Sequence, residues 1–179
     1  MWVIFLKTMN EPTQHPLVVT LALDEKSQRY FDQLRETYFP KERNWLRAHL
    51  TLFHQLPGEE IGAISQTLDK VSQQNEPPTL QVTQVKSIGR GVAFVLKNEP
   101  LMKIHRHLLN EWEAWLTPQD QQKLWPHITI QNKVTAEKAQ QTLQQIAPSF
   151  EPFTAKGTGL SLWKYLGGPW EFVQTFPFA

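Results

Sequence analysis

Two short segments of the chain combine a histidine with a hydroxyl side chain at the same spacing: "HLTL" at 49–52 and "HITI" at 127–130. In each segment the histidine and the threonine alternate with aliphatic residues, which is typical of a strand with one polar and one apolar face. Residues i and i+2 of a strand share a face, about 7 Å apart. We therefore expect His49 beside Thr51, and His127 beside Thr129.

Two imidazoles supported by two hydroxyls suit acid–base attack on a phosphodiester. A neutral histidine takes a proton from water or a ribose hydroxyl, while a protonated one gives a proton to the leaving oxygen; both forms are accessible at neutral pH. Threonine hydroxyls can donate hydrogen bonds to the non-bridging oxygens, where charge collects in the transition state. If the two strands face one cleft, His49 and His127 are the candidate catalytic pair, in an order that the sequence leaves open. Such a pair needs no metal or other cofactor.

The segments that must position these motifs alternate between strand and helix patterns. Asp24 and Thr135 are suitable caps for the first and last helices, and Pro40 ends the first. The motifs lie nearly half the chain apart, which suggests an internal duplication. The order of strand and helix patterns along the chain predicts an α+β fold of two lobes, with antiparallel or mixed sheets flanked by helices around a central cleft. Strand patterns cover residues 17–23, 46–56, 77–88, 92–97 and 127–134, with two or three more strands between 150 and 178, and helix patterns cover 25–39, 57–74, 99–116 and 135–147.

Length and composition limit the possible interpretations. The chain of 179 residues has the size of one domain or of two small lobes, and its net charge of +1 demands neither a nucleic-acid nor a membrane partner. It contains no cysteine, which excludes disulfides, thiolate catalysis and cysteine-based zinc sites. Residues 1–14 are expected to form a leader or an extra edge strand, because their apolar run is too short for a membrane span. Residues 15–179 then form a single bilobal domain, which we expect to be cytoplasmic and monomeric.

Several further residues are weaker candidates. Phe53 and Gln131 are expected on the same face as the motif residues, where Phe53 could stack on a base and Gln131 could bond a ribose or a base edge; packing at the cleft wall is the alternative for both. Arg90, in the turn "GRG", could belong to a phosphate-facing basic patch or to an ordinary solvated surface. Trp125 and Tyr165 are possible cleft residues.

The other histidines are expected outside the site. His54 should point away from His49 on its strand. His105 and His107 are two residues apart on a helix, so they face different directions and are poor joint ligands for a metal. We expect both on the surface.

The paired motifs resemble those of the two-histidine (2H) phosphoesterases, which include the 2′-5′ RNA ligase-like proteins and the RNA cyclic phosphodiesterases. The flanks "HLTLFHQLP" and "WPHITI" also fit, and the resemblance covers about residues 17–178. It implies a bilobal α+β fold with metal-independent chemistry on 2′,3′-cyclic phosphates or 2′-5′ linkages. By motif match it implies that His49 and His127 are the acid–base pair and that Thr51 and Thr129 bind the phosphate.

The sequence thus predicts a phosphodiesterase that acts on RNA ends or small nucleotide cyclic phosphates, with no membrane partner. The alternative is a non-catalytic module that binds RNA ends or nucleotides on the same scaffold. A metal site built on the two histidines fits the sequence less well than either of these, because neither motif contains a carboxylate. ATP-driven ligation is not expected, because the chain has no phosphate-binding loop motif.

Overall fold

The computed structural model describes residues 14–179, so the expected leader or edge strand lies almost entirely outside the described residues. The strands of this part are β1 (Leu17–Leu23), β2 (Leu50–Leu56), β3 (Thr79–Ser87), β4 (Val92–Lys97), β5 (His127–Gln131), β6 (Phe153–Tyr165) and β7 (Trp170–Pro177). Its α-helices are α1 (Glu25–Tyr38), α2 (Ile61–Gln73), α3 (Glu99–Glu111) and α4 (Ala136–Ile146).

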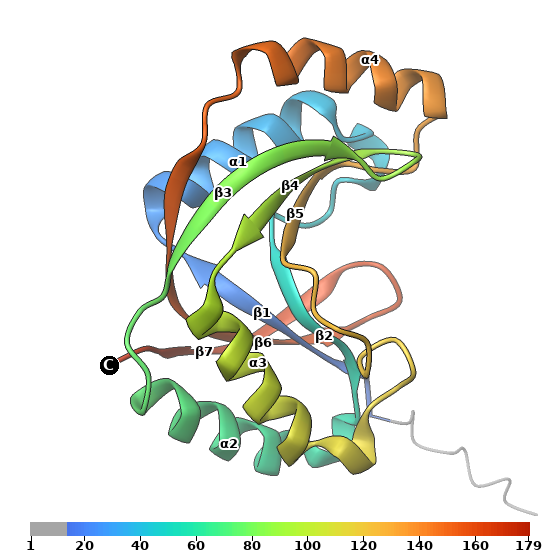
Figure 1. Ribbon diagram of the computed structural model, residues 1–179. Helices are drawn as coiled ribbons and strands as arrows, with labels where there is room; N and C mark the ends of the chain where they lie inside the picture. The colour runs from blue at the N-terminus through green and yellow to red at the C-terminus, as the bar shows by residue number, and fades with distance from the viewer. Residues whose placement is uncertain (1–13) are drawn as a thin grey trace, which may run out of the picture.

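The strands form one curled sheet in the order β2-β1-β6-β3-β4-β5, with β7 paired to β6. All of the pairings are antiparallel. The long strand β6 belongs to both halves, because its first residues pair with β3 and its later residues pair with β1 and β7. The curl brings β2 and β5, the two ends of the order, into contact (Figure 1). The predicted α+β fold of two lobes is confirmed.

The helices cover the two halves separately. α1 and α4 pack on the half that contains β3, β4 and β5, while α2 and α3 pack on the half built by β1, β2, β6 and β7 (Figure 1). Side-chain caps begin three of these helices: Asp24 accepts from the backbone N–H of Ser27, Asn98 from that of Leu101, and Thr135 from that of Lys138. Among residues 14–179, no helix has both the length and the apolar character required to cross a membrane.

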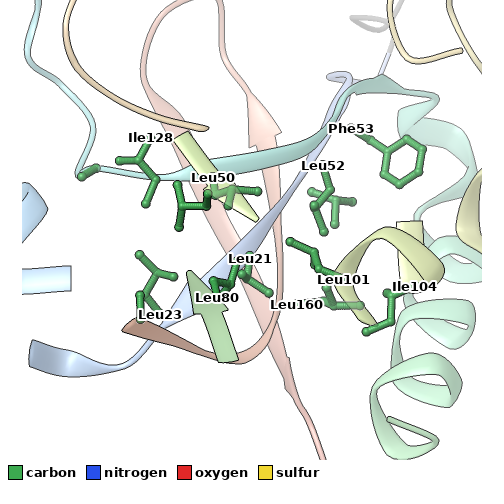
Figure 2. Close-up of a cluster of buried hydrophobic side chains, with 14 of the residues drawn as sticks. Leu21, Leu23, Leu50, Leu52, Phe53, Leu80, Leu101, Ile104, Ile128 and Leu160 are labelled. Atoms are coloured by element: carbon green, nitrogen blue, oxygen red, sulfur yellow. The ribbon is translucent and has the colours of Figure 1, made fainter. Parts of the chain in front are cut away.

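The core includes the aliphatic residues that alternate with the two motifs. Leu50 and Leu52 of β2 and Ile128 of β5 lie among the buried side chains that join the two halves (Figure 2). Leu101 and Ile104 of α3 pack against the same cluster (Figure 2). Burial of these positions fixes the opposite face of each strand, so His49, Thr51, His127 and Thr129 are turned away from the core.

Candidate active site

The first motif lies at the start of β2. His49 immediately precedes the strand and Thr51 lies within it, and both side chains are half-buried. The strand begins four residues later than the sequence pattern suggested, because the backbone before His49 is bound by side chains of α1 and not by a neighbouring strand. The backbone that carries the first imidazole is therefore held by a helix before His49 and by the sheet after it.

The second motif lies on β5, where His127 and Thr129 are half-buried and Ile128 and Ile130 are buried. Because β2 and β5 are in contact, the two motifs are neighbours across the curl of the sheet. The charge of a protonated His127 lowers the pKa of His49, which places the two imidazoles within electrostatic reach of each other. The structure thus brings together the four residues that the sequence singled out.

Both imidazoles are oriented by the same kind of hydrogen bond. Nδ1 of His49 lies 2.7 Å from the carbonyl oxygen of Arg47, and Nδ1 of His127 lies 2.8 Å from the carbonyl oxygen of Trp125. A carbonyl oxygen only accepts, so Nδ1 carries the hydrogen and donates it in both residues. In each case the acceptor belongs to the residue two positions before the histidine. This arrangement leaves Nε2 of both histidines for proton transfer.

Each imidazole also packs against an indole. His49 lies 4.7 Å from the Trp170 ring at an angle of 49°, and His127 stacks on Trp125 at 4.3 Å and 22°. Nζ of Lys86 lies 5.1 Å from the centroid of the Trp125 ring, within the range of a cation–π contact. The indoles restrict the rotamers of the histidines and remove water from their faces.

The surroundings keep both histidines neutral at pH 7 in the unliganded protein. Burial lowers the pKa of His49 to about 4, and the charges of Arg35, His127 and His54 lower it as well, against the opposing effect of the bond to Arg47. Burial likewise lowers the pKa of His127, with a contribution from His54. A bound phosphate would supply the negative charge that reverses these shifts.

A bulge follows the threonine in both motifs. Between the pairs Thr20–Thr51 and Val19–Phe53, β2 contains one residue more than β1. The register between β5 and β4 shifts in the same way after Thr129. A bulge turns the following residue to the other face of the strand. The two halves of the fold therefore repeat the motif together with the irregularity that ends it.

These bulges overturn the expectation that Phe53 and Gln131 share the cleft face. Phe53 is 0% exposed and stacks on His105 at 4.8 Å and 18°, so it cannot stack on a base. Gln131 is equally buried, and its Nε2 donates to the Thr142 hydroxyl at 2.8 Å. The expectation of a surface position for His105 is also wrong, because this imidazole is 4% exposed.

His54 is likewise not on the side expected for it. After the bulge its side chain is exposed, and its charge lowers the pKa of both His49 and His127. Nδ1 of His54 lies 3.0 Å from Oδ1 of Asp120, a buried carboxylate that also accepts the backbone N–H groups of His54 and Gln55. These bonds lower the pKa of Asp120 despite its burial. A third oriented imidazole therefore lies near the pair.

One face of α1 holds the loop that leads into His49. Nε2 of Gln28 donates to the carbonyl of Ala48 at 2.7 Å, and Oδ1 of Asp32 accepts the N–H of Ala48 at 2.8 Å. Arg35 is buried, and Nη1 of its guanidinium donates to the carbonyl of Thr129 in the second motif at 2.9 Å. Sequence reasoning missed this helix face; its only sequence signal is three polar residues at helical spacing.

The remaining candidates lie at the margins. The Arg90 side chain is exposed and donates to the carbonyl of Val134 at 3.0 Å, which ties its turn to the loop after β5. Tyr165 is exposed at the end of β6, and His107 is exposed on α3 as expected. Within residues 14–179, no three His, Cys, Asp or Glu side chains are grouped so that they could hold a metal ion.

A cavity of about 530 Å³ adjoins the motif on β2. His49 is one of its lining residues, whereas Thr51, His127 and Thr129 are not. The walls come from the loop before His49, from β1 and from the hairpin of β6 and β7, and they include Trp45, Trp163, Trp170 and Phe172. Sequence reasoning did not connect these aromatic residues or the hairpin with the first motif.

Comparison with models of protein families assigns the chain to a superfamily. Residues 23–169 match the model of the 2′-5′ RNA ligase superfamily, so the chain belongs to that superfamily. This membership confirms the resemblance to 2H phosphoesterases that the paired motifs indicated. No curated protein sequence matches the chain.

Solved structures with the same fold are distant in sequence. A structure titled as a phosphoesterase has a TM-score of 0.63 at 16% identity, and the match covers 93% of this chain and 99% of that one. E. coli LigT complexed with 3′-AMP has a TM-score of 0.61 at 17% identity, with 92% and 98% covered. The protein TT0787 of Thermus thermophilus has a TM-score of 0.60 at 17% identity, with 91% and 97% covered. These matches agree with the curled sheet and its flanking helices.

Proposed function

We propose that this protein is a metal-independent phosphodiesterase that opens ribose 2′,3′-cyclic phosphates or cleaves related 2′-5′ phosphodiesters. The observation that carries the proposal is the matched orientation of His49 and His127. Each donates from Nδ1 to a carbonyl two residues earlier, so both Nε2 atoms are available. Two imidazoles held in the same tautomer can divide the work of a general base and a general acid.

We assign the base to His49 and the acid to His127. His49 has its pKa lowered to about 4 and stays neutral over most of the pH range. It takes a proton from the attacking water, whose oxygen forms the new bond to phosphorus. The bond from phosphorus to one ribose oxygen then breaks, and His127 gives its proton to that oxygen. The product is a phosphate monoester beside a free ribose hydroxyl.

The threonines act on the phosphate itself. Thr51 and Thr129 stand two residues after the histidines on the same strand faces, and both are half-buried. Their hydroxyls can donate hydrogen bonds to the two non-bridging oxygens. Such donors stabilise the charge that develops in the transition state, and loss of one costs on the order of 10²-fold in rate.

The first experiment is turnover of 2′,3′-cyclic mononucleotides, of a short RNA with a cyclic phosphate end and of a 2′-5′ dinucleotide, all with EDTA present. We expect a phosphate monoester from one of these classes, and a rate lower by about 10²–10⁴-fold in His49→Ala and in His127→Ala. His107→Ala serves as the matched control, because this histidine is exposed on α3. Circular dichroism and thermal melting check that each variant is folded.

Three outcomes would overturn the proposal. A near-normal rate in either histidine variant would remove the acid–base pair. Binding of nucleotides without turnover of any substrate would instead indicate a module that binds RNA ends. Activity that disappears with EDTA and returns with a divalent cation would indicate metal-dependent chemistry.

A further inference from the structure

We propose that His54 is a third functional histidine of the site: Asp120 holds its ring at Nδ1, and Nε2 of the protonated ring donates to a non-bridging oxygen of the substrate phosphate. The inference rests on the proposed function, because it places that phosphate between His49 and His127. It gives the site a cationic donor in addition to the hydroxyls of the two threonines. Asp120 is then a positioning residue that acts through His54.

The pairing of β2 with β1 puts His54 on the strand face that carries the first motif. Between Thr51 and Phe53, β2 has one residue more than β1. Phe53 and its partner Val19 are both buried, so the next residue along β2 is turned to the opposite face. That residue is His54, whose side chain is 45% exposed. The first bulge therefore brings a second imidazole of β2 to the face of His49.

A second irregularity of β2 fixes the backbone of His54. Between Phe53 and Leu56, β2 again contains one residue more than β1. In this segment Oδ1 of Asp120 accepts the backbone N–H of His54 at 2.8 Å, and Oδ2 accepts that of Gln55 at 2.9 Å. A carboxylate from outside the sheet thus takes the place of the missing strand partner. The backbone position of His54 is set by Asp120.

The same carboxylate fixes the ring of His54. Oδ1 of Asp120 lies 3.0 Å from Nδ1 of His54. Burial raises the pKa of Asp120, but the bonds from His54 and Gln55 outweigh this effect and lower the pKa, so the carboxylate is ionised. An ionised carboxylate only accepts, so Nδ1 of His54 carries a hydrogen in both protonation states. Protonation then adds an N–H at Nε2, on the opposite edge of the ring.

Asp120 also places His54 between the two motifs. It belongs to the loop of residues 116–126, which leads directly into His127, whereas His54 follows the first motif on β2. Besides burial, which is the main cause, the charge of His54 lowers the pKa of both His49 and His127. The ring of His54 is therefore within electrostatic reach of both histidines, as a group that binds the phosphate between them must be.

The arginines nearest to the first motif are engaged within the protein. Arg35 donates to the backbone carbonyls of Leu46 and Thr129, and Nη2 of Arg47 lies 2.7 Å from Oδ2 of Asp32. His54 is bound to the protein through Nδ1, which leaves Nε2 for a ligand. A phosphodiester carries one negative charge on two non-bridging oxygens, and a charged donor binds such an oxygen more strongly than a hydroxyl does.

The test uses a variant that keeps the bond to Asp120. The amide nitrogen of an asparagine side chain lies near the position of Nδ1, so His54→Asn can still donate to Asp120 but has no atom at the position of Nε2. Inorganic phosphate is titrated at pH 6, with tryptophan fluorescence as the readout, because Trp125 and Trp170 pack against the two catalytic candidates. We expect the dissociation constant to rise by about 10-fold or more, as for loss of one charge-assisted hydrogen bond.

Gln55→Asn is the matched control. It shortens an exposed side chain one residue further along β2, next to the same carboxylate. It should leave the affinity for phosphate at the wild-type value. A wild-type affinity in His54→Asn overturns the inference, and so does a loss of affinity that Gln55→Asn shares.

A measurement on the wild-type protein decides the question if His54→Asn does not fold. The imidazole Hε1 signals are followed by NMR while inorganic phosphate is added. The signal of His54 should move along the same saturation curve as those of His49 and His127, and the signal of the exposed His107 should not move. A His54 signal that stays in place, or three signals that all stay in place, overturns the inference.

Turnover separates this inference from the proposed function. If a 2′,3′-cyclic phosphate is turned over, His54→Asn should lower kcat/KM by about 10–100-fold, chiefly through a higher KM. Each protein is measured at the pH of its own maximum, because loss of the His54 charge also changes the pKa of His49 and His127.

The two ideas fail in different ways. If no phosphodiester is turned over, the proposed function fails, while weaker phosphate binding in His54→Asn still supports the role of His54. If His54→Asn has the wild-type kcat/KM, the acid–base pair stands and the role of His54 is overturned.

Discussion

Nη1 of Arg35 donates a 2.9 Å hydrogen bond to the carbonyl oxygen of Thr129, and this bond ties α1 to the second motif. Through Nε, the same guanidinium donates to the carbonyl of Leu46 at 2.9 Å and to Oδ1 of Asn44 at 2.8 Å. Both acceptors belong to the loop that leads into His49. One buried cation therefore sets the position of each motif relative to the other.

Loss of this cation should weaken both stability and catalysis. Arg35→Met leaves three acceptors without their donor, and we expect a loss of about 3 kcal/mol in the free energy of unfolding. Turnover should fall as well at temperatures where the variant is still folded. Arg106→Met is the control; Arg106 is exposed and pairs with exposed Glu99, so the change should stay within about 0.5 kcal/mol. Urea unfolding measures the stability of both variants. A wild-type urea midpoint for Arg35→Met would contradict the role of Arg35 in positioning the two motifs.

The pH profile of kcat/KM should be bell-shaped with its maximum below pH 6.5. Its acid limb reports protonation of His49, the proposed base, whose pKa is lowered to about 4. Its alkaline limb reports loss of the proton from His127, whose pKa is lowered from 6.5. The profile of kcat should lie at higher pH, because a bound phosphate raises the pKa of both histidines. A kcat/KM maximum above pH 7 would be inconsistent with these shifts.

Replacement of His54 should raise the pKa of both catalytic candidates. Its positive charge disfavours protonation of His49 and of His127, so His54→Gln removes a common cause of their lowered pKa values. NMR titration of the imidazole Hε1 signals measures this without any substrate. His107→Gln should leave both titrations unchanged. Unaltered titrations in the His54 variant would show that its charge does not reach the pair.

Stability should decrease as the pH falls below 6.5. Burial lowers the pKa of His49, His105 and His127, so the unfolded chain binds protons more strongly than the folded protein between the lowered values and 6.5. The urea midpoint should therefore be lower at pH 5 than at pH 7. His105→Phe, which keeps a ring against Phe53 and cannot be protonated, should reduce this difference. An equal difference in the variant would exclude His105 as a contributor.

Two glycine substitutions should have opposite effects on the stability of the folded protein. A Cβ atom on Gly91 would lie 2.0 Å from the backbone oxygen of Gln131, at the bulge of β5. Gly91→Ala must push β4 and β5 apart, and we expect it to cost about 2 kcal/mol or more. Gly62 lies in α2 with nothing within 4 Å of such an atom, so Gly62→Ala should stabilise by about 0.5–1 kcal/mol. Thermal melting of the two variants distinguishes these signs.

Local patterns were sufficient to predict the strands and helices and to select His49, Thr51, His127 and Thr129. They failed at Phe53 and Gln131, because a bulge depends on the partner strand and leaves no mark on alternation within one strand. The spacing of His105 and His107 on one helix also led us to expect His105 on the surface, whereas the ring of Phe53 in fact covers it.

Contacts between distant segments could not be predicted from local sequence patterns for the same reason. The packing of Trp170 on His49 joins the hairpin of β6 and β7 to the first motif. The bond from Arg35 to Thr129 crosses from α1 to β5. Neither pair has a periodic signal, since each is created only when the sheet curls.

The position of β6 in the sheet has a consequence for biosynthesis. β6 pairs with β1 in one half and with β3 in the other, yet it is translated after both of them. During synthesis, neither β1 nor β3 can pair with β6 until the ribosome has passed residues 153–165. Both halves therefore close in a single late step, and a chain that stalls earlier would present two unpaired strand edges to chaperones and proteases.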